Sequence, residues 1–372
     1  MKKIVFLRGQ SPNPRFMKRL NLLKDKYEAI LTYWEKEPTL KSAFMMPKVR
    51  VHRIESEADT KNPIGRMKPY YEFRRKAYEV LVTEKPDLIY AEALDVLDIA
   101  CAYKRRKDSK VKIIYEIADL HRYIIDEPKS FKMKVIRSIL RNVDKQNGKL
   151  VDTLVLTSEK FYDIYFSSFI EKEKMLFIPN MPDIVPLKDY KPKNHNGIKT
   201  IGFIGRIRYI NECKILIEAA HRAGWNVLFA GSELGDTIKK ICEKYSYKYL
   251  GEFDFNTQIK DIYEQCDVVY SVYDSDMMNV RVALPNKLYE SIYCELPIIV
   301  AKNTYLQELV ERDGVGCAVN HDSVDELAEL LMSLDSNQEM YNKLCENCRA
   351  HKSEIDENIY SAKLIDRIDR LI

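Results

Sequence analysis

The sequence predicts an α/β fold built from two doubly wound domains, each formed around a parallel sheet. Candidate strands and amphipathic helical segments alternate from one end of the chain to the other. The chain has 372 residues, which is enough for two domains of ordinary size. A segment rich in lysine and proline, 184–197, lacks periodicity and separates two runs of this alternation. Alternating strands and helices favour parallel sheets with helices on both faces.

Short apolar runs predict the strands of the first domain, 1–185. These strands are Lys3–Leu7, Glu28–Tyr33, Arg50–Ile54, Leu88–Ala91, Lys112–Glu116 and Thr153–Thr157. Apolar residues at helical spacing predict the helices between them. The clearest of these helices are Glu72–Thr83, Leu94–Arg106 and Lys132–Lys149.

The same alternation restarts in the second domain, 198–353. Its predicted strands are Thr200–Ile204, Asn226–Ala230, Lys248–Leu250, Val268–Tyr273 and Ile298–Ala301. Its predicted helices are Cys213–Ala223, Asp236–Lys244, Asn256–Glu264, Asn286–Cys294, Val324–Asp335 and Gln338–Arg349. A last helix, 354–372, has one apolar face.

The composition is that of a globular protein and argues against several classes of protein. The chain has 60 basic and 56 acidic residues, a balance that disfavours a dedicated nucleic-acid binder. No apolar run approaches the roughly 20 residues of a membrane span, and Met1–Leu7 turns polar too soon for a signal peptide. The eight cysteines are scattered among apolar segments, which favours reduced core residues of a cytoplasmic protein. No metal site is expected, because Cys345, Cys348 and His351 lie in a helical pattern without a second ligand pair nearby.

A proline, Pro285, opens a short helix before a buried strand. Proline suits the first helical position because it has no amide hydrogen to lose there. The amides of Asn286, Lys287 and Leu288 would then lack intrahelical partners and point at whatever lies in front of the helix. Such a helix start is an anion site to which Lys287 adds a positive charge, and Glu290 shares its face. The group suits the phosphates and ribose of a nucleotide, although a well-capped helix with a surface Lys–Glu pair has the same spacing.

Each domain begins with a strand that runs into a glycine. Gly9 and Gln10 follow the first strand of the first domain, and Gly205, Arg206 and Arg208 follow that of the second. Glycine permits a tight turn, and the two arginines lie where phosphates would dock. Neither turn completes the G-x-G-x-x-G fingerprint, which disfavours a dinucleotide-dependent oxidoreductase. The chain also lacks the G-x-x-x-x-G-K-[ST], H-E-x-x-H and G-x-S-x-G motifs.

Several motifs, taken in order, resemble a known family. They are Gly202-x-x-Gly205-Arg206, Ala230-Gly231-Ser232, Tyr249-Leu250-Gly251-Glu252, Cys266–Tyr273, Leu284–Glu290 and Leu296–Val300. In this order and spacing, the chain resembles the donor-binding half of a GT-B glycosyltransferase of family 4, of the kind that builds bacterial capsule, exopolysaccharide or lipopolysaccharide. The resemblance is strong over 200–320 and weaker over 1–183. It implies two Rossmann-like domains facing a central cleft, with the last helix, 354–372, packed on the first domain.

The resemblance also implies a nucleotide-sugar donor site on the second domain. Its expected residues are Gly205, Arg206, Arg208, Asn279, Asn286, Lys287, Leu288 and Glu290. Glu290 matches the family glutamate that binds the ribose, and Arg206 matches the arginine that holds the diphosphate. Another family glutamate, which contacts the donor sugar, corresponds to Ala283 here. The sugar pocket is therefore expected to differ from that of the family and to use Asn279 or Asp276.

The first domain is expected to bind the acceptor. Gly9, Gln10 and Arg122 are its expected acceptor-binding residues. A family loop that often reads histidine–aspartate corresponds to Ala118-Asp119, so that Ala118 replaces the histidine. Asp119 and the nearby His121 are the catalytic candidates. A helix cap at Asp119 and an ordinary surface position for His121 are the alternatives.

The implied function is transfer of a sugar from a nucleotide-diphosphate sugar to a glycan or lipid-linked acceptor, with retention of configuration and without a metal or cofactor. Because Ala118 and Ala283 depart from the family pattern, a second possible function stays open, that of a non-catalytic subunit that binds nucleotide sugars. A third possible function, that of a sugar-nucleotide epimerase, ranks lower. No nucleic-acid partner is expected. Basic and aromatic residues mix at 66–76 and 129–137. These stretches leave open either peripheral contact with the cytoplasmic face of the inner membrane or two ordinary solvated helix faces.

Overall fold

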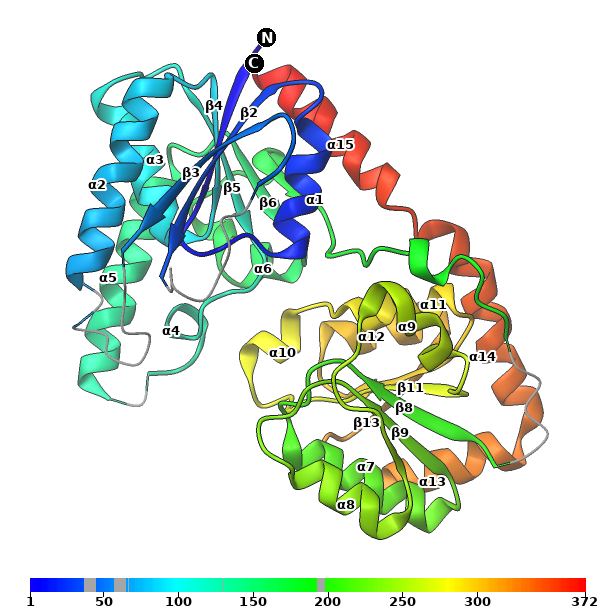
Figure 1. Ribbon diagram of the computed structural model, residues 1–372. Helices are drawn as coiled ribbons and strands as arrows, with labels where there is room; N and C mark the ends of the chain where they lie inside the picture. Colours follow the sequence, from blue (N-terminus) through cyan, green and yellow to red (C-terminus); the bar gives the residue numbers. More distant parts are fainter. Residues whose placement is uncertain (37–44, 57–64, 66, 129, 193–197) are drawn as a thin grey trace. The chain divides into compact units, whose positions relative to one another are not determined.

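The computed structural model describes residues 1–36, 45–56, 65, 67–128, 130–192 and 198–372. The chain forms two compact units, which Figure 1 shows in colours that follow the sequence. Unit 1 comprises Met1–Pro179 and Asn358–Ile372, and unit 2 comprises Asn180–Glu357. Part of the segment expected to link the domains, Val185–Leu187, forms a short 3-10 helix that contacts another helix of unit 2. The predicted fold class of two parallel-sheet domains is confirmed.

Unit 1 is built around a seven-stranded parallel sheet with the order β3-β2-β1-β4-β5-β6-β7. The strands are β1 (Lys3–Arg8), β2 (Glu28–Glu35), β3 (Val49–Glu55), β4 (Leu88–Glu92), β5 (Lys112–Ile117), β6 (Thr153–Leu156) and β7 (Met175–Phe177). The helices are α1 (Pro14–Leu23), α2 (Met67–Glu84), α3 (Leu94–Arg106), α4 (Arg122–Ile125), α5 (Phe131–Gly148) and α6 (Lys160–Ile164). The register pairs Ile4 with Ala29 on one side and Leu88 on the other.

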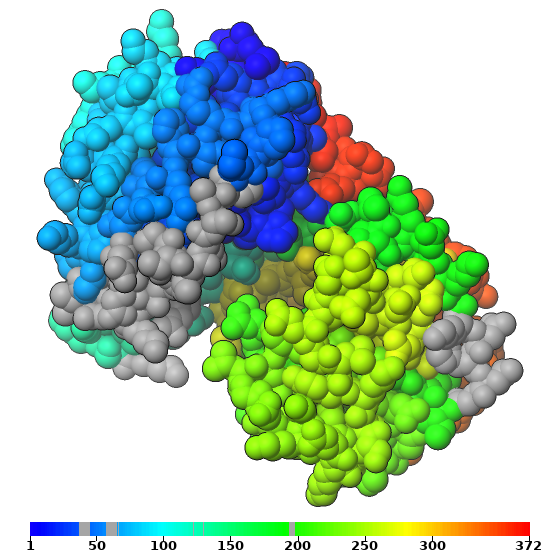
Figure 2. Space-filling model, viewed as in Figure 1, coloured from blue at the N-terminus to red at the C-terminus, as the bar shows by residue number. Residues whose placement is uncertain are grey.

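The helix α15 (Glu357–Leu371) belongs to unit 1. Its residues Leu364 and Ile368, one helical turn apart, are fully buried in the same apolar cluster as Ile4 and Phe16. Figures 1 and 2 show this helix, in red, against the dark blue N-terminal part of the chain. No helix in the described part of the chain is long and apolar enough to span a bilayer.

Unit 2 is built around a six-stranded parallel sheet with the order β10-β9-β8-β11-β12-β13. The strands are β8 (Thr200–Ile204), β9 (Asn226–Ala230), β10 (Lys248–Tyr249), β11 (Val268–Ser271), β12 (Ile298–Ala301) and β13 (Gly316–Val319). The helices are α7 (Ile210–Ala223), α8 (Thr237–Tyr245), α9 (Phe255–Tyr263), α10 (Met278–Val282), α11 (Asn286–Tyr293), α12 (Tyr305–Asp313), α13 (Val324–Ser336) and α14 (Gln338–His351).

Both sheets have a topological switch point, at which the strand order reverses. It lies between β1 and β4 in unit 1 and between β8 and β11 in unit 2. Ligands of doubly wound sheets bind outside the carboxyl ends of the strands at this point. The two switch points are therefore the first places to look for functional groups.

Candidate functional site

The carboxyl end of β8 turns at Gly205, beside the switch point of unit 2. Gly205 has a φ of +121°, a backbone conformation that favours glycine. Its amide donates a hydrogen bond of 2.7 Å to the carbonyl oxygen of Ala230. A Cβ atom on Gly231, whose φ is +146°, would lie only 1.9 Å from the carbonyl oxygen of Gly205. The two glycines therefore allow the backbone segments after β8 and β9 to lie close to each other at the carboxyl ends of these strands.

Lys287, in the first turn of α11, reaches this turn. A Cβ atom on Gly205 would lie 3.6 Å from Lys287 Cε. The ammonium nitrogen lies 3.6 Å from the ring centroid of Phe203 and 5.2 Å from that of Tyr273. Lys287 is only 6% exposed, and its Nζ has no hydrogen-bond partner among the described residues. A buried ammonium without a hydrogen-bond partner is costly, and aromatic faces replace its hydration only in part. The arrangement therefore favours an anionic ligand beside Gly205.

The start of α11 differs in detail from the sequence prediction. Pro285 lies just before the helix with extended backbone, and Asn286 is the first helical residue. The Leu288 amide donates to the carbonyl oxygen of Pro285 at 3.2 Å, so the expectation that this amide lacks a partner is wrong. A short i→i+3 bond of this kind tightens the first helical turn. The side chain of Asn286 is held in place, because its Oδ1 accepts a hydrogen bond of 2.7 Å from Asn180 Nδ2.

Glu290 lies one turn further along α11 and is 5% exposed. Its Oε2 accepts a hydrogen bond of 2.5 Å from the Tyr263 hydroxyl. Burial raises the pKa of Glu290, while the Tyr263 hydroxyl and the Lys287 charge oppose that rise. Because Lys287 and Glu290 are both buried, the alternative of a surface lysine–glutamate pair is wrong.

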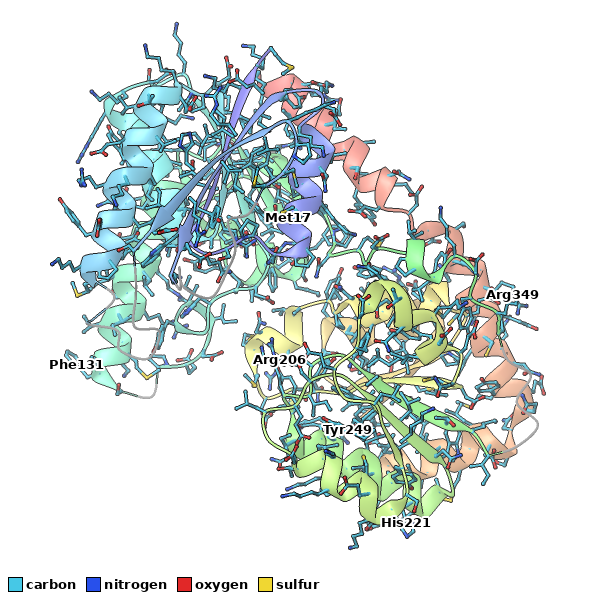
Figure 3. The ribbon with its side chains drawn as sticks, in the orientation of Figure 1. Met17, Phe131, Arg206, His221, Tyr249 and Arg349 are labelled. Atoms are coloured by element: carbon cyan, nitrogen blue, oxygen red, sulfur yellow. The ribbon has the colours of Figure 1, made fainter. Side chains whose placement is uncertain are left out.

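The remaining donor candidates surround the same switch point. Arg206, labelled in Figure 3, and Arg208 are both exposed on the segment after Gly205. The described residues offer neither guanidinium an ion-pair partner within 4.0 Å, which leaves both groups available to an anion. Asn279 is half-buried on α10, whereas Asp276 is exposed and lies 3.7 Å from Arg281.

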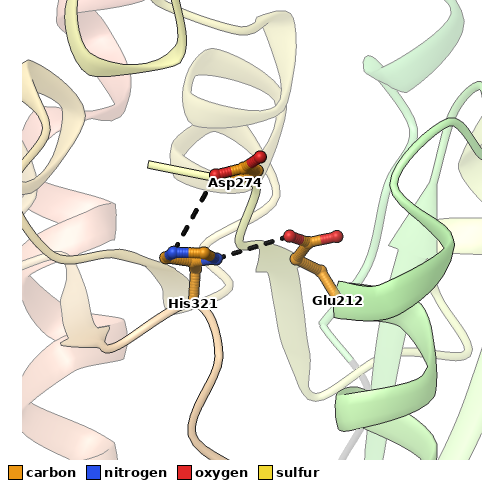
Figure 4. A group of neighbouring side chains, drawn as sticks. All are labelled: Glu212, Asp274 and His321. Carbon is orange, nitrogen blue, oxygen red and sulfur yellow. Dashed lines mark hydrogen bonds and ion pairs between the residues drawn. The ribbon is translucent and has the colours of Figure 1, made fainter. Parts of the chain in front are cut away.

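A group of three side chains near this edge of the sheet was not predicted from the sequence. His321 lies between Glu212 and Asp274 (Figure 4), with Nδ1 3.4 Å from a Glu212 oxygen and Nε2 3.9 Å from an Asp274 oxygen. The two carboxylates face different ring nitrogens, and each of the three residues offers one atom that could be a ligand of a metal ion. Glu212 lies on α7, whereas Asp274 and His321 follow β11 and β13, and their spacing in the sequence carries no metal-site signature.

In unit 1, a cavity of about 650 Å³ lies at the switch point between β1 and β4. Three residues singled out from the sequence, Gly9, Gln10 and His121, line it. The Nδ1 atom of His121 accepts a hydrogen bond of 3.3 Å from the Tyr123 amide. Asp119 is exposed and does not line the cavity. Arg122 is the first residue of α4, and its side chain lies outside the described part of the structure.

Two residues that line this cavity, Arg8 and Glu92, carry buried charges that the sequence analysis missed. Arg8 is 2% exposed, and its Nη1 lies 2.7 Å from Glu92 Oε2. Arg15 pairs with Glu92 and, at 3.5 Å, with the fully buried Glu116. Burial lowers the pKa of Arg8 and raises that of Glu92. Arg8 ends β1 and Glu92 ends β4, so charged residues at the ends of apolar strands were the available signal.

The comparisons with known proteins agree with this geometry. Residues 188–351, which include the Gly205 turn and all of α11, match the model of the family described as glycosyl transferases group 1. These residues are similar to the group 1 glycosyltransferases. The resemblance of this half of the chain to glycosyltransferases is thereby confirmed, and the match supports the predicted transferase class.

Relatives extend the likeness beyond this domain. The succinoglycan biosynthesis protein ExoL of Rhizobium meliloti is 22% identical over 269 residues, which are 68% of this chain and 65% of ExoL. The alignment thus spans just under two thirds of that relative. Sucrose-phosphate synthase from Thermosynechococcus elongatus has a TM-score of 0.74 at 12% identity and covers 100% of this chain and 99% of its own. HepE of Anabaena, in complex with UDP, has a TM-score of 0.69 at 16% identity and covers 100% of both chains. These two likenesses confirm the GT-B fold.

Proposed function

We propose that this protein is a glycosyltransferase that moves a sugar from a nucleoside-diphosphate sugar to a glycan or lipid-linked acceptor during synthesis of a cell-surface polysaccharide. The observation that carries the proposal is the buried, unpaired ammonium of Lys287 beside the Gly205 turn. It provides a positive charge where the fold binds phosphates. The group 1 domain and the relative in succinoglycan biosynthesis support the same reaction class.

The donor diphosphate would lie against Lys287, Arg206 and the first turn of α11, with its ribose near Glu290. During transfer the bond between the anomeric carbon and the diphosphate oxygen breaks. The acceptor oxygen forms the new bond to that carbon, and its proton leaves with the diphosphate. The cations and the helix start would stabilise the negative charge of the departing group. We propose that this stabilisation suffices without a metal ion and that configuration is retained.

A panel of nucleotide sugars, assayed for sugar transfer and for slow donor hydrolysis, tests the proposal. Glu290→Ala is expected to raise the Michaelis constant for the donor strongly, because the ribose loses its carboxylate. Glu243→Ala, on the exposed face of α8, is the matched control and should behave like the wild type. Wild-type kinetics for Glu290→Ala would remove the ribose assignment. Nucleotide binding without turnover across the panel would instead favour a non-catalytic subunit, and conversion of the donor alone would favour an epimerase.

We also propose peripheral contact with an anionic membrane through α5. Its residues Phe131, Val135 and Ile139 form a stripe at four-residue spacing and are 81%, 42% and 57% exposed. Exposed basic residues flank this stripe, and the acidic residue of α5, Asp144, is fully buried. An apolar stripe beside basic groups suits the surface of an anionic bilayer.

The other basic stretch is a weaker candidate. Its cations Arg75 and Lys76 on α2 already pair with Glu79 and Glu72. Positions 66 and 129 of the two stretches lie outside the described residues. Co-sedimentation with phosphatidylglycerol vesicles should be lost on Lys132→Glu with Lys134→Glu and retained on Arg75→Glu with Lys76→Glu. Equal loss in both pairs of variants would argue against a specific role for α5.

A further inference from the structure

The two units share the arrangement of strands at the switch point, but the charged group beside the glycine turn has the opposite sign in each. In unit 2, the ammonium of Lys287 lies beside Gly205. In unit 1, the carboxylate of Asp95 lies beside Gly9, where a Cβ atom would be 1.9 Å from Asp95 Oδ2. A glycine turn at the switch point is where sheets of this kind bring phosphate close to the backbone. A carboxylate in that place repels phosphate and attracts a hydrogen-bond donor.

Asp95 differs from the other acidic side chains of the unit 1 cavity. Glu92 has Arg8 as its partner, and Asp98 is ion-paired with Arg74. Asp95 Oδ1 accepts a hydrogen bond of 3.1 Å from the Val96 amide, and Oδ2 is the oxygen that lies beside Gly9. Burial raises the pKa of Asp95, and the charges of Lys36 and Arg8, which also line the cavity, oppose that rise. The cavity therefore contains a carboxylate that has no ion-pair partner within 4.0 Å among the described residues.

The backbone before Asp95 is strained. Ala93 has a φ of +77° although it is not a glycine. Such a conformation costs on the order of 1–3 kcal/mol and persists where neighbouring groups hold it, often at ligand sites. Here the Ala93 amide donates to the carbonyl oxygen of Glu116 at 3.1 Å. The turn at Ala93 leads directly into Leu94 and Asp95, which both line the cavity.

We propose that this cavity binds an uncharged, hydroxyl-rich ring of the acceptor, and that Asp95 accepts the hydrogen of one of its hydroxyl groups. Ile124, Leu140 and Val143 form an apolar wall of the cavity, which suits the C–H face of a sugar ring. The carboxylate disfavours a phosphate group beside Gly9, although Arg8 and Lys36 line the same cavity. This inference names the chemistry of the acceptor site and rests on the proposed transferase function.

The test titrates the full-length protein with two probes by ligand-observed NMR. Octyl β-D-glucopyranoside, below its micelle concentration, is the uncharged ring, and glucose 6-phosphate is the anionic one. Asp95→Ala is expected to weaken binding of the glucoside at least about tenfold, because a hydrogen bond to a charged group is lost. Asp95→Asn should lose less, because the amide oxygen still accepts. The control Asp163→Asn, on the exposed side of α6, should match the wild type.

Three results would overturn the inference. They are failure of the glucoside to bind the wild type, unchanged binding in Asp95→Ala, and binding of glucose 6-phosphate as tight as that of the glucoside. Urea unfolding of both Asp95 variants shows whether they are folded, and Asp95→Asn keeps the shape of the side chain. UDP and GDP titrations of the same samples separate the two proposals. If the wild type binds neither UDP nor GDP, the donor site is refuted, whereas the inference about the glucoside site is not affected.

Discussion

Replacing Lys287 by methionine is expected to move stability and nucleotide affinity in opposite directions. The ammonium is buried over Phe203 and Tyr273 without a hydrogen-bond partner among the described residues. Its attraction to the two rings is worth about 0.5–2 kcal/mol, whereas an unpaired buried charge costs more than that. Methionine keeps the length of the side chain and places sulfur over the rings. The free energy of unfolding without ligand should therefore stay unchanged or rise by about 1–2 kcal/mol.

The same change should weaken binding of a nucleoside diphosphate. At an effective dielectric constant of 20, unit charges about 4 Å apart attract each other by about 4 kcal/mol. Desolvation of the phosphate removes part of this energy, and hydrogen bonds to charged groups contribute about 1.5–3 kcal/mol. The dissociation constant for UDP or GDP should therefore rise by about tenfold to a hundredfold.

Isothermal titration calorimetry measures the affinity, and urea unfolding without nucleotide measures the stability. Lys199→Met is the matched control, because Lys199 is also buried but its Nζ donates a hydrogen bond of 2.6 Å to the carbonyl oxygen of Leu334. That variant should lose stability and keep its affinity. A Lys287→Met protein that is less stable than the wild type and binds nucleotide equally well would refute the reasoning, because Lys287 would then be a structural lysine.

Three further changes test other parts of the structure. Gly231→Ala should lower the free energy of unfolding by about 2–3 kcal/mol in urea, because the new Cβ would meet the Gly205 carbonyl oxygen at 1.9 Å; a neutral effect would mean that the turn relaxes. Arg206→Ala with Arg208→Ala should weaken nucleotide binding and reduce its salt dependence, with a stability change within about 0.5 kcal/mol; unchanged calorimetric titrations would exclude these arginines. Burial raises the pKa of Asp144 from 3.8 to about 6, so the folded protein holds this proton more tightly than the unfolded chain. The Asp144 contribution to the free energy of unfolding should therefore fall by up to about 3 kcal/mol between pH 4 and pH 6, and Asp144→Asn should abolish that fall; identical pH profiles would contradict it.

The sequence pattern finds some short strands and misses others. It finds β10 and β12, which have two and four residues, and misses β7 and β13, which have three and four. Gly316 also hides β13, since a glycine is a poor strand residue in isolation. The structure shows why it is there: a Cβ atom at Gly316 would lie 1.9 Å from the carbonyl oxygen of Ile298. Helix α1 was missed because Arg15 and Arg19, which bind the buried carboxylates, interrupt its apolar pattern.

The candidate site was predictable only where its groups are adjacent in the sequence. Lys287 and Glu290 share one helix and could be recognised together. The rings under Lys287 come from β8 and from the segment after β11, which become neighbours only through the strand order. Asp95 could not be singled out either, because its significance depends on the approach of α3 to Gly9. Local spacing therefore indicated the phosphate end of the donor site, and tertiary contacts determine the rest.

Because α15 belongs to unit 1, the core of unit 1 can be completed only after all of unit 2 has been synthesised. β1 is translated before all of unit 2, and α15 is translated after it. Unit 2 is contiguous and can complete its core as it leaves the ribosome, whereas the cluster around Ile4 must wait for Leu364 and Ile368. At about 5–20 residues per second, this wait is on the order of ten seconds or more. During that time the nascent unit 1 exposes an apolar surface to chaperones, although most of its residues were made first.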